Sequence, residues 1–433
     1  MKFNRSTLAV ALLAAIAAPA AHAEITIDVI GGSEVSFEGL VQAEGNWFHN
    51  DVADLNSAGT AGTAASAGSN GGDSEFAIRR AEIILKGKGP GNYEWTLGYD
   101  PSSQKTASVV NDSNNGATRV TSSVASGGKW LDVNIKYKFG GNANHYLQVG
   151  QFKQPNSLEE LSSTRFNDFI SKAAVTNTYA VARRTGVALS YGDTNWGVTG
   201  SYFGRELTRN LGQGQGYGLR GTWAPINDAG SILAFGASYV NYDTQLDSFQ
   251  LRARPDADLA TLRLVDGGNL RNVDRVGITG LEGLWVHGPF KLQGEYYQAN
   301  LKRYGAGSKD YKTDGAYLSG VWNVTGETWG YKSGVPVTTL PEEPGTLGMW
   351  QLGLRYETLD LNDGTGNATT GAVAGVLGGK QDIWTFGVNW YWRSNFKFSA
   401  NYVKVNSSKW STSARRSVDD NPSIIEARAQ FYW

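Results

Sequence analysis

The residue types needed for acid–base catalysis or metal binding are sparse in this sequence. The chain has no cysteine, and its four histidines lie far apart, at His22, His49, His145 and His287. A catalytic base needs a partner side chain, and a metal site needs several ligands at close spacing. A Gly-rich stretch at residues 212–216 also lacks the Lys-Ser/Thr pair of a phosphate-binding loop. We therefore expect no cofactor and no metal, and an enzyme is a rival that these residues do not favour.

A pair of arginines offers different chemistry, because guanidinium groups bind anions. Arg79 and Arg80 are adjacent, so in a regular strand their side chains leave opposite faces. Apolar residues follow at every second position from Ala81, which places Arg80 and Glu82 together on the polar face. Arg79 then faces the apolar side. Two alternatives are that it lies beyond the part of the strand that a membrane would cover, or that a bulge in the strand turns it to the polar face.

A second group of charges occupies residues 154–182 and the start of the segment after them. A pore selects ions with the charges at its narrowest point, and a loop of this kind could supply them. The alternative is a solvated loop that neutralises itself, since both signs are present. The charged residues are Glu159, Glu160, Arg165, Asp168, Lys172, Arg183 and Arg184.

The elements that must position these residues are strands with alternating apolar and polar side chains. The final segment, residues 423–433, has Ile425 and Phe431 on one face and Glu426 and Arg428 on the other, and it ends on an aromatic residue. We count sixteen such segments: 35–48, 75–88, 91–100, 129–139, 144–153, 183–192, 195–206, 215–225, 231–242, 276–287, 289–302, 312–326, 347–360, 381–392, 395–406 and 423–433.

The connections between these segments alternate between short, turn-forming sequences and long loops. This is the pattern of an all-β, 16-stranded antiparallel transmembrane β-barrel, with short periplasmic turns and long extracellular loops. An even number of strands lets such a barrel close without a free edge. Only the join at residues 327–346 is long where a short turn is expected. The 55 Gly, 20 Tyr, 16 Phe and 14 Trp residues, with 18% charged residues, suit turns and membrane interfaces.

The N-terminus has the features of an export signal. A positive start is followed by an apolar core too short to span a membrane, and then by the small-residue site Ala21-His22-Ala23. We predict a signal peptide at residues 1–23, a barrel domain at residues 24–433 and a location in the bacterial outer membrane. The formal net charge of −1 gives no global basic field, so we expect no nucleic-acid partner.

Several motifs in this order resemble the phosphate-selective porin O/P family. The segment F-A-I-R-R-A at residues 76–81 is similar to the R-R-A signature of the second strand in that family. Further matches are L-R-G at 219–221, R-A-R-P at 252–255, E-G-L-W at 282–285, T-G-E at 325–327, G-V-N-W-Y at 387–391 and A-N-Y-V-K at 400–404. The resemblance implies a homotrimer of sixteen-strand barrels, and a C-terminal strand recognised by the outer-membrane assembly machinery.

The resemblance also implies channel residues that bind small anions such as phosphate. Arg79 and Arg80 match the arginine pair, and Arg252 and Arg254 match an arginine ladder in the fifth long loop (residues 243–275), with Arg263 as a further candidate. The remaining matches are hydroxyl donors, flanking basic positions and one acid at the constriction: Ser162, Ser163, Lys312, Lys332 and Asp132.

This chain departs from the phosphate-selective pattern in three places. Glu159 and Glu160 stand where that pattern has a lysine, and Glu94 stands at another basic position. The fifth long loop has six Asp against five Arg, so it is not a basic funnel. We expect a water-filled porin in contact with outer-membrane lipid, for passive diffusion of small hydrophilic solutes, with an anion or phosphate preference. The alternatives are a general or weakly cation-preferring porin, a non-conducting barrel and, least favoured, an outer-membrane enzyme.

Overall fold

The computed structural model describes residues 25–27, 34–56, 74–102, 128–208, 213–244, 247–305, 307–340 and 347–433. The predicted signal peptide, residues 1–23, lies outside the described residues. No helix in these ranges is both long enough and apolar enough to cross a membrane. The same ranges contain no cluster of three or more His, Cys, Asp or Glu side chains that could hold a metal ion.

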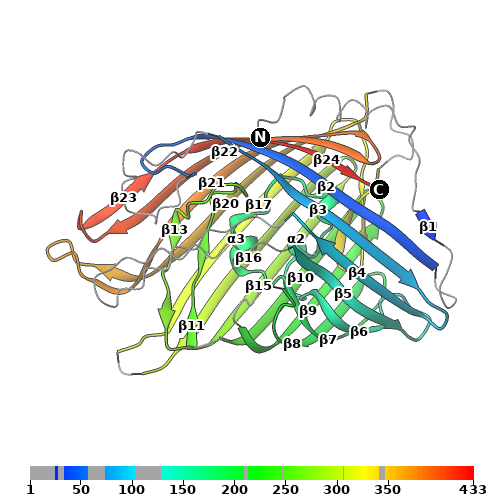
Figure 1. The fold of residues 1–433 in the computed structure, drawn as a ribbon, viewed down its shortest axis with the longest axis horizontal. Coiled ribbons are helices and arrows are strands. Elements are labelled where there is room, and N and C mark those ends of the chain that lie inside the picture. Colours follow the sequence, from blue (N-terminus) through cyan, green and yellow to red (C-terminus); the bar gives the residue numbers. More distant parts are fainter. Residues whose placement is uncertain are drawn as a thin grey trace.

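Sixteen antiparallel strands form a closed barrel (Figure 1), which confirms the predicted fold class and strand number. Each strand pairs with its neighbour in sequence, and β24 pairs with β2 to close the barrel, with Leu40 opposite Tyr432. The barrel strands are β2 Glu34–His49, β3 Ser74–Lys88, β4 Tyr93–Asp100, β5 Lys129–Lys138, β6 Tyr146–Lys153, β7 Arg183–Gly192, β8 Trp196–Phe203, β9 Gln213–Asp228, β10 Ser231–Thr244, β15 Val273–His287, β16 Phe290–Arg303, β17 Tyr311–Asn323, β20 Met349–Gly366, β21 Val373–Arg393, β22 Phe396–Ser411 and β24 Ser423–Tyr432.

Two short strands extend the same sheet. β1, Ile25–Ile27, pairs with the start of β2, and β23, Arg416–Asp420, pairs with the end of β22. β1 lies by the end with short turns, and β23 lies at the end with long loops (Figure 1). We call these the turn end and the loop end of the barrel.

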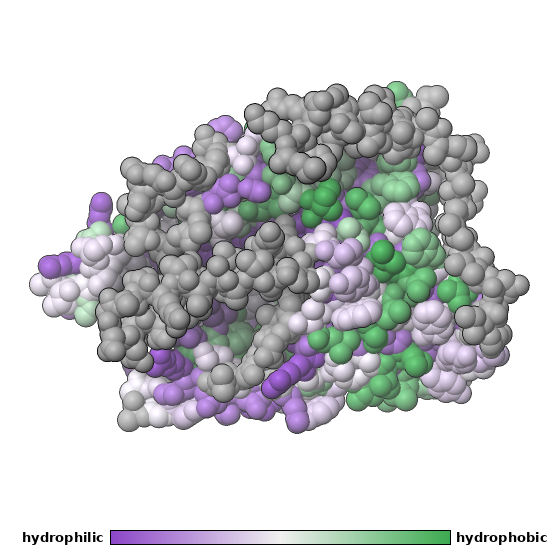
Figure 2. Space-filling model, in the orientation of Figure 1, coloured by the Kyte–Doolittle hydropathy of each residue, from purple (hydrophilic) through white to green (hydrophobic). Residues whose placement is uncertain are grey.

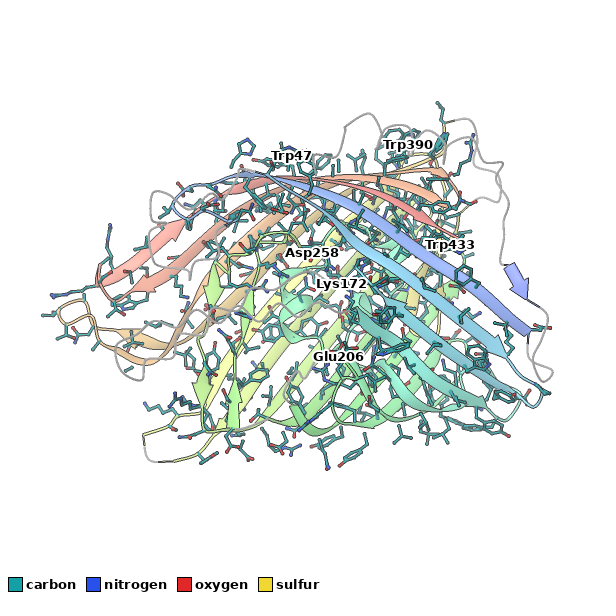
Figure 3. The ribbon with its side chains drawn as sticks, viewed as in Figure 1. Trp47, Lys172, Glu206, Asp258, Trp390 and Trp433 are labelled. Atoms are coloured by element: carbon teal, nitrogen blue, oxygen red, sulfur yellow. The ribbon has the colours of Figure 1, made fainter. Side chains whose placement is uncertain are left out.

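The wall has an apolar outer face and a polar inner face. In β24, the Ile425 side chain is 43% exposed, whereas the neighbouring Glu426 is fully buried inside the barrel. Figure 2 shows hydrophobic side chains gathered right of centre on the face drawn, and more hydrophilic side chains toward β23. Trp47, packed against Phe76 with 5.2 Å between ring centroids, and Trp390 lie near opposite ends of the wall (Figure 3). Aromatic residues at both ends of an apolar band are typical of membrane barrels.

Residues 154–182, which we call loop 3, fold into the barrel as three short helical segments. These are α2 Leu158–Leu161, η1 Thr164–Phe166 and α3 Ala174–Tyr179. The Glu295 carboxylate on β16 accepts hydrogen bonds from the backbone N–H groups of Leu158 and Glu159, both at 2.8 Å. The first turn of a helix leaves such donors without intrahelical partners, so a wall carboxylate fixes the start of α2.

The connection between β10 and β15, which we call loop 5, also turns into the barrel. It contains the short strands β11 Ser248–Phe249, β12 Arg252–Ala253, β13 Val265–Asp266 and β14 Leu270–Arg271. Buried apolar side chains of loop 5, α3 and the wall pack together, among them Ala257, Val175 and Leu361. A hydrophobic core thus fills part of the lumen and holds loops 3 and 5 against the strands.

The long join after β17 forms a hairpin that folds back inside the barrel. Its strands are β18 Trp329–Lys332 and β19 Val335–Thr338. Trp329 is fully buried, and the Gly334 carbonyl accepts a hydrogen bond of 2.8 Å from Nη2 of Arg220 on the wall. Gly334 has φ +80°, a conformation that favours glycine. The join is long because it fills the turn end of the lumen.

Candidate pore and its constriction

Loop 3 lies between two cavities inside the barrel. One cavity, of about 300 Å³, lies on the side of loop 3 that faces the loop end, and we call it the loop-end chamber. The other, of about 450 Å³, lies on the side that faces the turn end, and we call it the turn-end chamber. Four residues line both cavities and therefore mark the junction between them: Lys153, Thr164, Asn167 and Arg183. Solutes that pass through the lumen by this route meet these side chains.

The loop-end chamber is strongly basic. Among the described residues, eight cationic side chains and only two carboxylates, Glu160 and Asp258, line it. Lys172 and Asp258 lie well inside the barrel (Figure 3). Four of the eight cations also pair with carboxylates outside the lining, namely Glu82, Asp100, Asp132 and Glu44, which offset part of the positive charge. A narrow cavity with low-dielectric walls concentrates the field of the charge that remains. The eight cationic residues are Arg79, Arg80, Lys129, Lys153, Lys172, Arg183, Arg184 and Arg428.

Arg79 and Arg80 both line this chamber because β3 contains a bulge at Arg79. Arg80 pairs with Gln42 of β2, but the next residue of β2, Ala43, pairs with Ile78. Arg79 is the extra residue, and its side chain turns inward beside that of Arg80. The bulge is one of the two alternatives to a lipid-facing Arg79 that the sequence left open.

Each of these arginines has a carboxylate partner. Nε of Arg79 lies 2.9 Å from Oδ2 of Asp258 in loop 5, and Nη1 of Arg80 lies 2.7 Å from Oε1 of Glu82. Arg428, on β24 two strands from β3 in the same part of the wall, also approaches Asp258, at 3.7 Å. Burial opposes ionisation of Asp258, but the Arg79 and Arg428 guanidinium groups hold its pKa well below its usual range.

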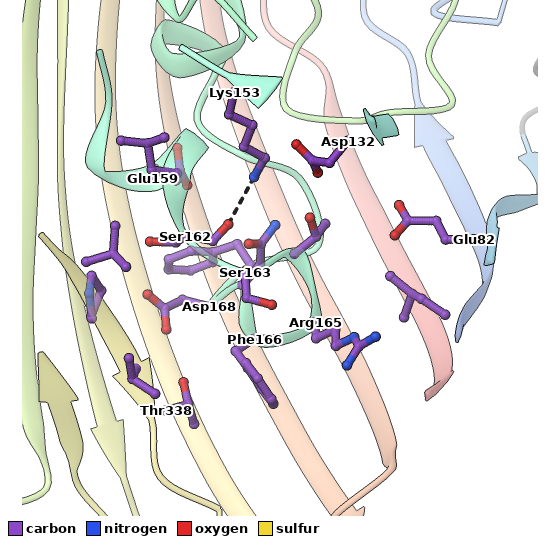
Figure 4. Close-up of a pocket in the computed structure, with 18 of the residues that line it drawn as sticks. Glu82, Asp132, Lys153, Glu159, Ser162, Ser163, Arg165, Phe166, Asp168 and Thr338 are labelled. Carbon is purple, nitrogen blue, oxygen red and sulfur yellow. Dashed lines mark hydrogen bonds between the residues drawn. The ribbon is translucent and has the colours of Figure 1, made fainter. Parts of the chain in front are cut away.

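Lys153 is the cation at the centre of the junction. Its Nζ donates hydrogen bonds to the backbone carbonyls of Glu160 and Ser162, the second at 3.2 Å (Figure 4). Arg183, the other basic residue of the junction, contacts Asp132, with Nη2 and Oδ2 2.7 Å apart. The predicted acid Asp132 is therefore the counter-ion of a junction arginine.

The turn-end chamber has balanced charge and a partly apolar lining. Its five cationic side chains face five carboxylates, and several of them pair directly, such as Arg165 with Glu38 at 2.8 Å and Lys291 with Asp168 at 2.7 Å. Half of the uncharged lining is hydrophobic and comes from loop 3, the β18–β19 hairpin and the wall: Leu161, Phe166, Phe169, Val335, Pro336, Val337, Leu40 and Ile84.

The two predicted serines both line the turn-end chamber, but their hydroxyl groups differ in hydrogen bonding. The Ser162 hydroxyl donates a 2.7 Å hydrogen bond to the backbone carbonyl of Leu158, so its proton is already engaged. Ser163 is exposed, and its side chain makes no capping hydrogen bond to the short helix that follows. Ser163 is therefore the better placed of the two to meet a solute.

The predicted arginine ladder lies in loop 5, away from the junction. Arg252 lines a separate cavity of about 180 Å³ beside α3, and Nε of Arg254 donates to the Ala260 carbonyl at 2.7 Å. Burial, together with the neighbouring Arg254 and Arg252, lowers the pKa of Arg263. None of the three lines the loop-end chamber, but their charges lie close enough to act on one another.

The structure does not bring Lys312, Lys332 or Glu94 to the junction. Lys312 is exposed and shares its face of β17 with Leu318, which is 54% exposed on the outer surface. Lys332 is exposed at the tip of the β18–β19 hairpin, and Glu94 pairs with Lys138 at 2.6 Å on the turn side. For Lys312 the reason is strand alternation: its side chain points to the outer face of β17 and therefore cannot line the lumen.

Some residues of the basic chamber were not predicted as site residues. Lys153, Lys129 and Arg428 were missed, although Arg428 lies on the polar face of the final strand. Arg428 also donates a 3.0 Å hydrogen bond from Nε to Glu44, which joins the last strand to the first. Strand parity could have identified this residue, whereas the position of Lys153 matters only because loop 3 folds over it.

A closed sixteen-strand barrel with an apolar outer band and a polar lumen narrowed by an inward loop is an outer-membrane porin, a channel-forming protein. The family model described as phosphate-selective porin O and P matches residues 41–433. The chain belongs to this family.

Two curated relatives are similar to parts of the chain. Porin O of Pseudomonas aeruginosa is 32% identical over 211 residues, which cover 45% of this chain and 48% of that protein. An uncharacterized protein of Caulobacter vibrioides is 28% identical over 291 residues, covering 63% of this chain and 56% of the relative. The matches therefore span about half the length of these relatives.

Solved structures of outer-membrane proteins share the fold over nearly the whole chain. OmpT of Vibrio cholerae has a TM-score of 0.55 at 12% identity, with 94% of this chain and 100% of that chain covered. An anion-selective porin from Comamonas acidovorans has a TM-score of 0.54 at 13% identity, with 93% and 100% covered. The channel DcaP of Acinetobacter baumannii has a TM-score of 0.52 at 13% identity, with 94% and 99% covered. At these identities the likeness concerns the fold.

Proposed function

We propose that this porin prefers small anions and that the loop-end chamber sets the preference. The observation that carries the proposal is the ratio of eight cationic side chains to two carboxylates around this chamber. Chloride, phosphate and small carboxylates are attracted into such a cavity, and small cations are repelled. Membership of a family described as phosphate-selective supports the same direction, as does the shared fold of the anion-selective Comamonas acidovorans porin.

Phosphate is the solute class for which the arginine pair is best suited. Guanidinium groups bind phosphate oxygens through paired N–H donors, and Arg79 and Arg80 lie side by side in the chamber. Asp258 and Glu82 each occupy one of these arginines. We therefore propose a pore that attracts phosphate with other anions and does not hold it as tightly as an unpaired arginine cluster would.

The balanced turn-end chamber favours a second candidate, a general porin with little charge preference. Its paired charges leave size and polarity to decide which solutes pass. The two candidates differ in which chamber limits the flow of ions. Reversal potential in planar bilayers across a KCl gradient separates them: we expect a potential of the sign given by chloride selectivity. A potential near zero supports the general porin, and one of cation sign contradicts both proposals.

Transport, and not catalysis, is the function that we propose for the lumen. Among the described residues, His145 stacks on Tyr191 with 4.0 Å between ring centroids, and His287 stacks on Trp285 at 5.9 Å. Each of these histidines is therefore used in a ring contact on the barrel wall. A measurable single-channel conductance in bilayers tests the proposal against a non-conducting barrel.

We further propose a homotrimer in outer-membrane lipid, reached after removal of residues 1–23. One solved relative of the fold is described as a trimer form, which supports this assembly state. The β24 strand is the proposed signal for the assembly machinery. Its aromatic end is tied to β2 by a 3.1 Å hydrogen bond from the Gly39 N–H to the Trp433 carbonyl. Crosslinking of purified protein in detergent, followed by electrophoresis, tests the trimer.

A further inference from the structure

Glu160 is the carboxylate of the basic chamber that lies nearest the junction. Its Oε2 accepts a hydrogen bond from Nζ of Lys172, and its Oε1 lies 3.9 Å from Nζ of Lys153. The carboxylate therefore sits between two ammonium groups. Lys153 is the residue that lines both chambers, so this contact is on the path between them.

The backbone holds Glu160 in this place. Its N–H donates a 3.0 Å hydrogen bond to Oγ of Ser157, which caps the start of α2. The same turn is fixed to the wall through Glu295. The side chains of Glu160, Lys172 and Lys153 are only 10%, 11% and 14% exposed, so the contact is also shielded on several sides. A short, fixed tether of this kind keeps the carboxylate at high effective concentration beside the lysines.

The other carboxylates near the junction pair with arginines, so Glu160 is the carboxylate that contacts Lys153 and Lys172. Asp132 is engaged by Arg183 at 2.7 Å, and Asp258 is engaged by Arg79 at 2.9 Å. Burial works against the ionised form of Glu160, but Lys172 and Lys153 lower its pKa to about 2. The group is thus a permanent carboxylate at neutral pH, seated where two ammonium groups could otherwise bind the oxygens of a solute.

We propose that Glu160 is a tethered competitor that fills an oxyanion subsite formed by Nζ of Lys153 and Nζ of Lys172. The inference rests on the proposed anion preference and makes it more specific. Phosphate and other oxyanions are attracted to the chamber but meet a site that already holds a carboxylate. They therefore pass through without saturating the pore. Removal of the Glu160 charge leaves Lys172 without its carboxylate and Lys153 held only by backbone carbonyls, so that the two groups together form a binding site for the solute.

The test is block of chloride current by inorganic phosphate in planar bilayers, at one salt concentration and at pH 5, so that Lys153 and Lys172 are both protonated. We expect the half-blocking phosphate concentration to fall by about tenfold or more in Glu160→Gln, because one charge at contact distance in a partly hydrated site changes affinity by that order. Asp310→Asn is the matched control, since Asp310 is an exposed carboxylate paired with Lys302 at 2.5 Å on the outer surface. Equal block of the two variants overturns the proposal.

A second comparison separates the subsite from a general change in chamber charge. In the double variant Glu160→Gln with Lys172→Met, one of the two ammonium groups is gone, so we expect the tight phosphate block to be lost. Block that stays as tight as in Glu160→Gln alone would place the site elsewhere and overturn the assignment. Glu160→Ala repeats the test if the Gln variant gives no folded channel.

Failure of the proposed function is distinguishable from failure of this inference. The reversal potential of the unsubstituted protein in KCl decides the anion preference. The ratio of phosphate block between Glu160→Gln and Asp310→Asn decides whether Glu160 fills an oxyanion subsite, whatever the sign of that potential.

Discussion

Arg355 on β20 and Asp256 in loop 5 form an ion pair inside the barrel, with Nη2 and Oδ2 2.6 Å apart and both side chains at most 1% exposed. Nη1 of the same guanidinium group donates to the Ser171 carbonyl of loop 3 at 3.1 Å and lies 3.4 Å from Glu159. One wall arginine therefore fastens both inward loops.

We expect Arg355→Ala to loosen loops 3 and 5 together. Removing one partner of a buried, hydrogen-bonded pair costs about 3–5 kcal/mol, because it leaves the other charge without compensation. Thermal unfolding in detergent should show a lower midpoint, and single-channel records should show larger or noisier conductance. Lys302→Ala, which breaks an exposed pair, is the control and should leave both unchanged within error. An unaltered record for Arg355→Ala would mean that the loops are held by their apolar contacts.

The inward-turned arginine pair should matter for selectivity. Arg80→Glu replaces a chamber cation with a carboxylate beside Glu82, so the ratio of chloride to potassium permeability should fall about threefold or more. Reversal potential in a KCl gradient measures this ratio. Lys312→Glu makes the same charge change on the outer face and should have a much smaller effect. Equal shifts in the two variants would remove Arg80 from the site.

The β18–β19 hairpin should depend on Trp329. This side chain is fully buried against wall residues such as Leu284 and Val321. Truncation of a large buried aromatic residue costs about 3–5 kcal/mol. We expect Trp329→Ala to lower the unfolding midpoint and to open the join between residues 327 and 346 to protease. Trp350→Ala, on the exposed outer face, is the comparison. A join that stays resistant in Trp329→Ala would contradict this view of the anchor.

The two carboxylates of the loop-end chamber should not take up protons in mild acid. The pKa of Glu160 is about 2, and that of Asp258 is held well below its usual range. A carboxylate whose pKa is lowered in the folded state keeps its ion pair above that pKa, and loses it only as the pH falls through it. Both chamber carboxylates thus stay ionised from pH 7 to pH 5. In Lys153→Arg, whose guanidinium group stays charged over the whole interval, the reversal potential should be constant, and a strong rise in anion preference would show that one of the carboxylates gains a proton.

The barrel could be predicted from the sequence because its wall follows a local rule. Alternation of apolar and polar side chains, with turn residues between segments, defines each strand without knowledge of its neighbours. Each of the sixteen predicted segments overlaps one barrel strand, although β20, β21 and β22 extend several residues further toward the loop end than predicted, and the long join after β17 was recognisable as an exception. The predictions based on strand parity, such as the outward Ile425 and the inward Glu426, agree with the structure.

The site was harder to predict, because it depends on contacts between distant segments. The bulge that turns Arg79 inward is a mismatch between β2 and β3, and it has no signature in β3 alone. Lys153 is important only because loop 3 folds over it. For Lys312 the two sequence signals disagree: the family resemblance implies a channel position, whereas the alternation of β17 places this lysine on the same face as the outward apolar residues, where the structure has it.

The pairing of β24 with β2 has a consequence for how the molecule is made. The side chains of Gln42 and Gln430, separated by 388 positions in the chain, are hydrogen-bonded across this seam. No shorter piece of the wall can complete its own circle, and until the final strand arrives the growing sheet has two unpaired borders open to other chains. Closure of the barrel therefore requires almost the whole polypeptide, from β2 to β24.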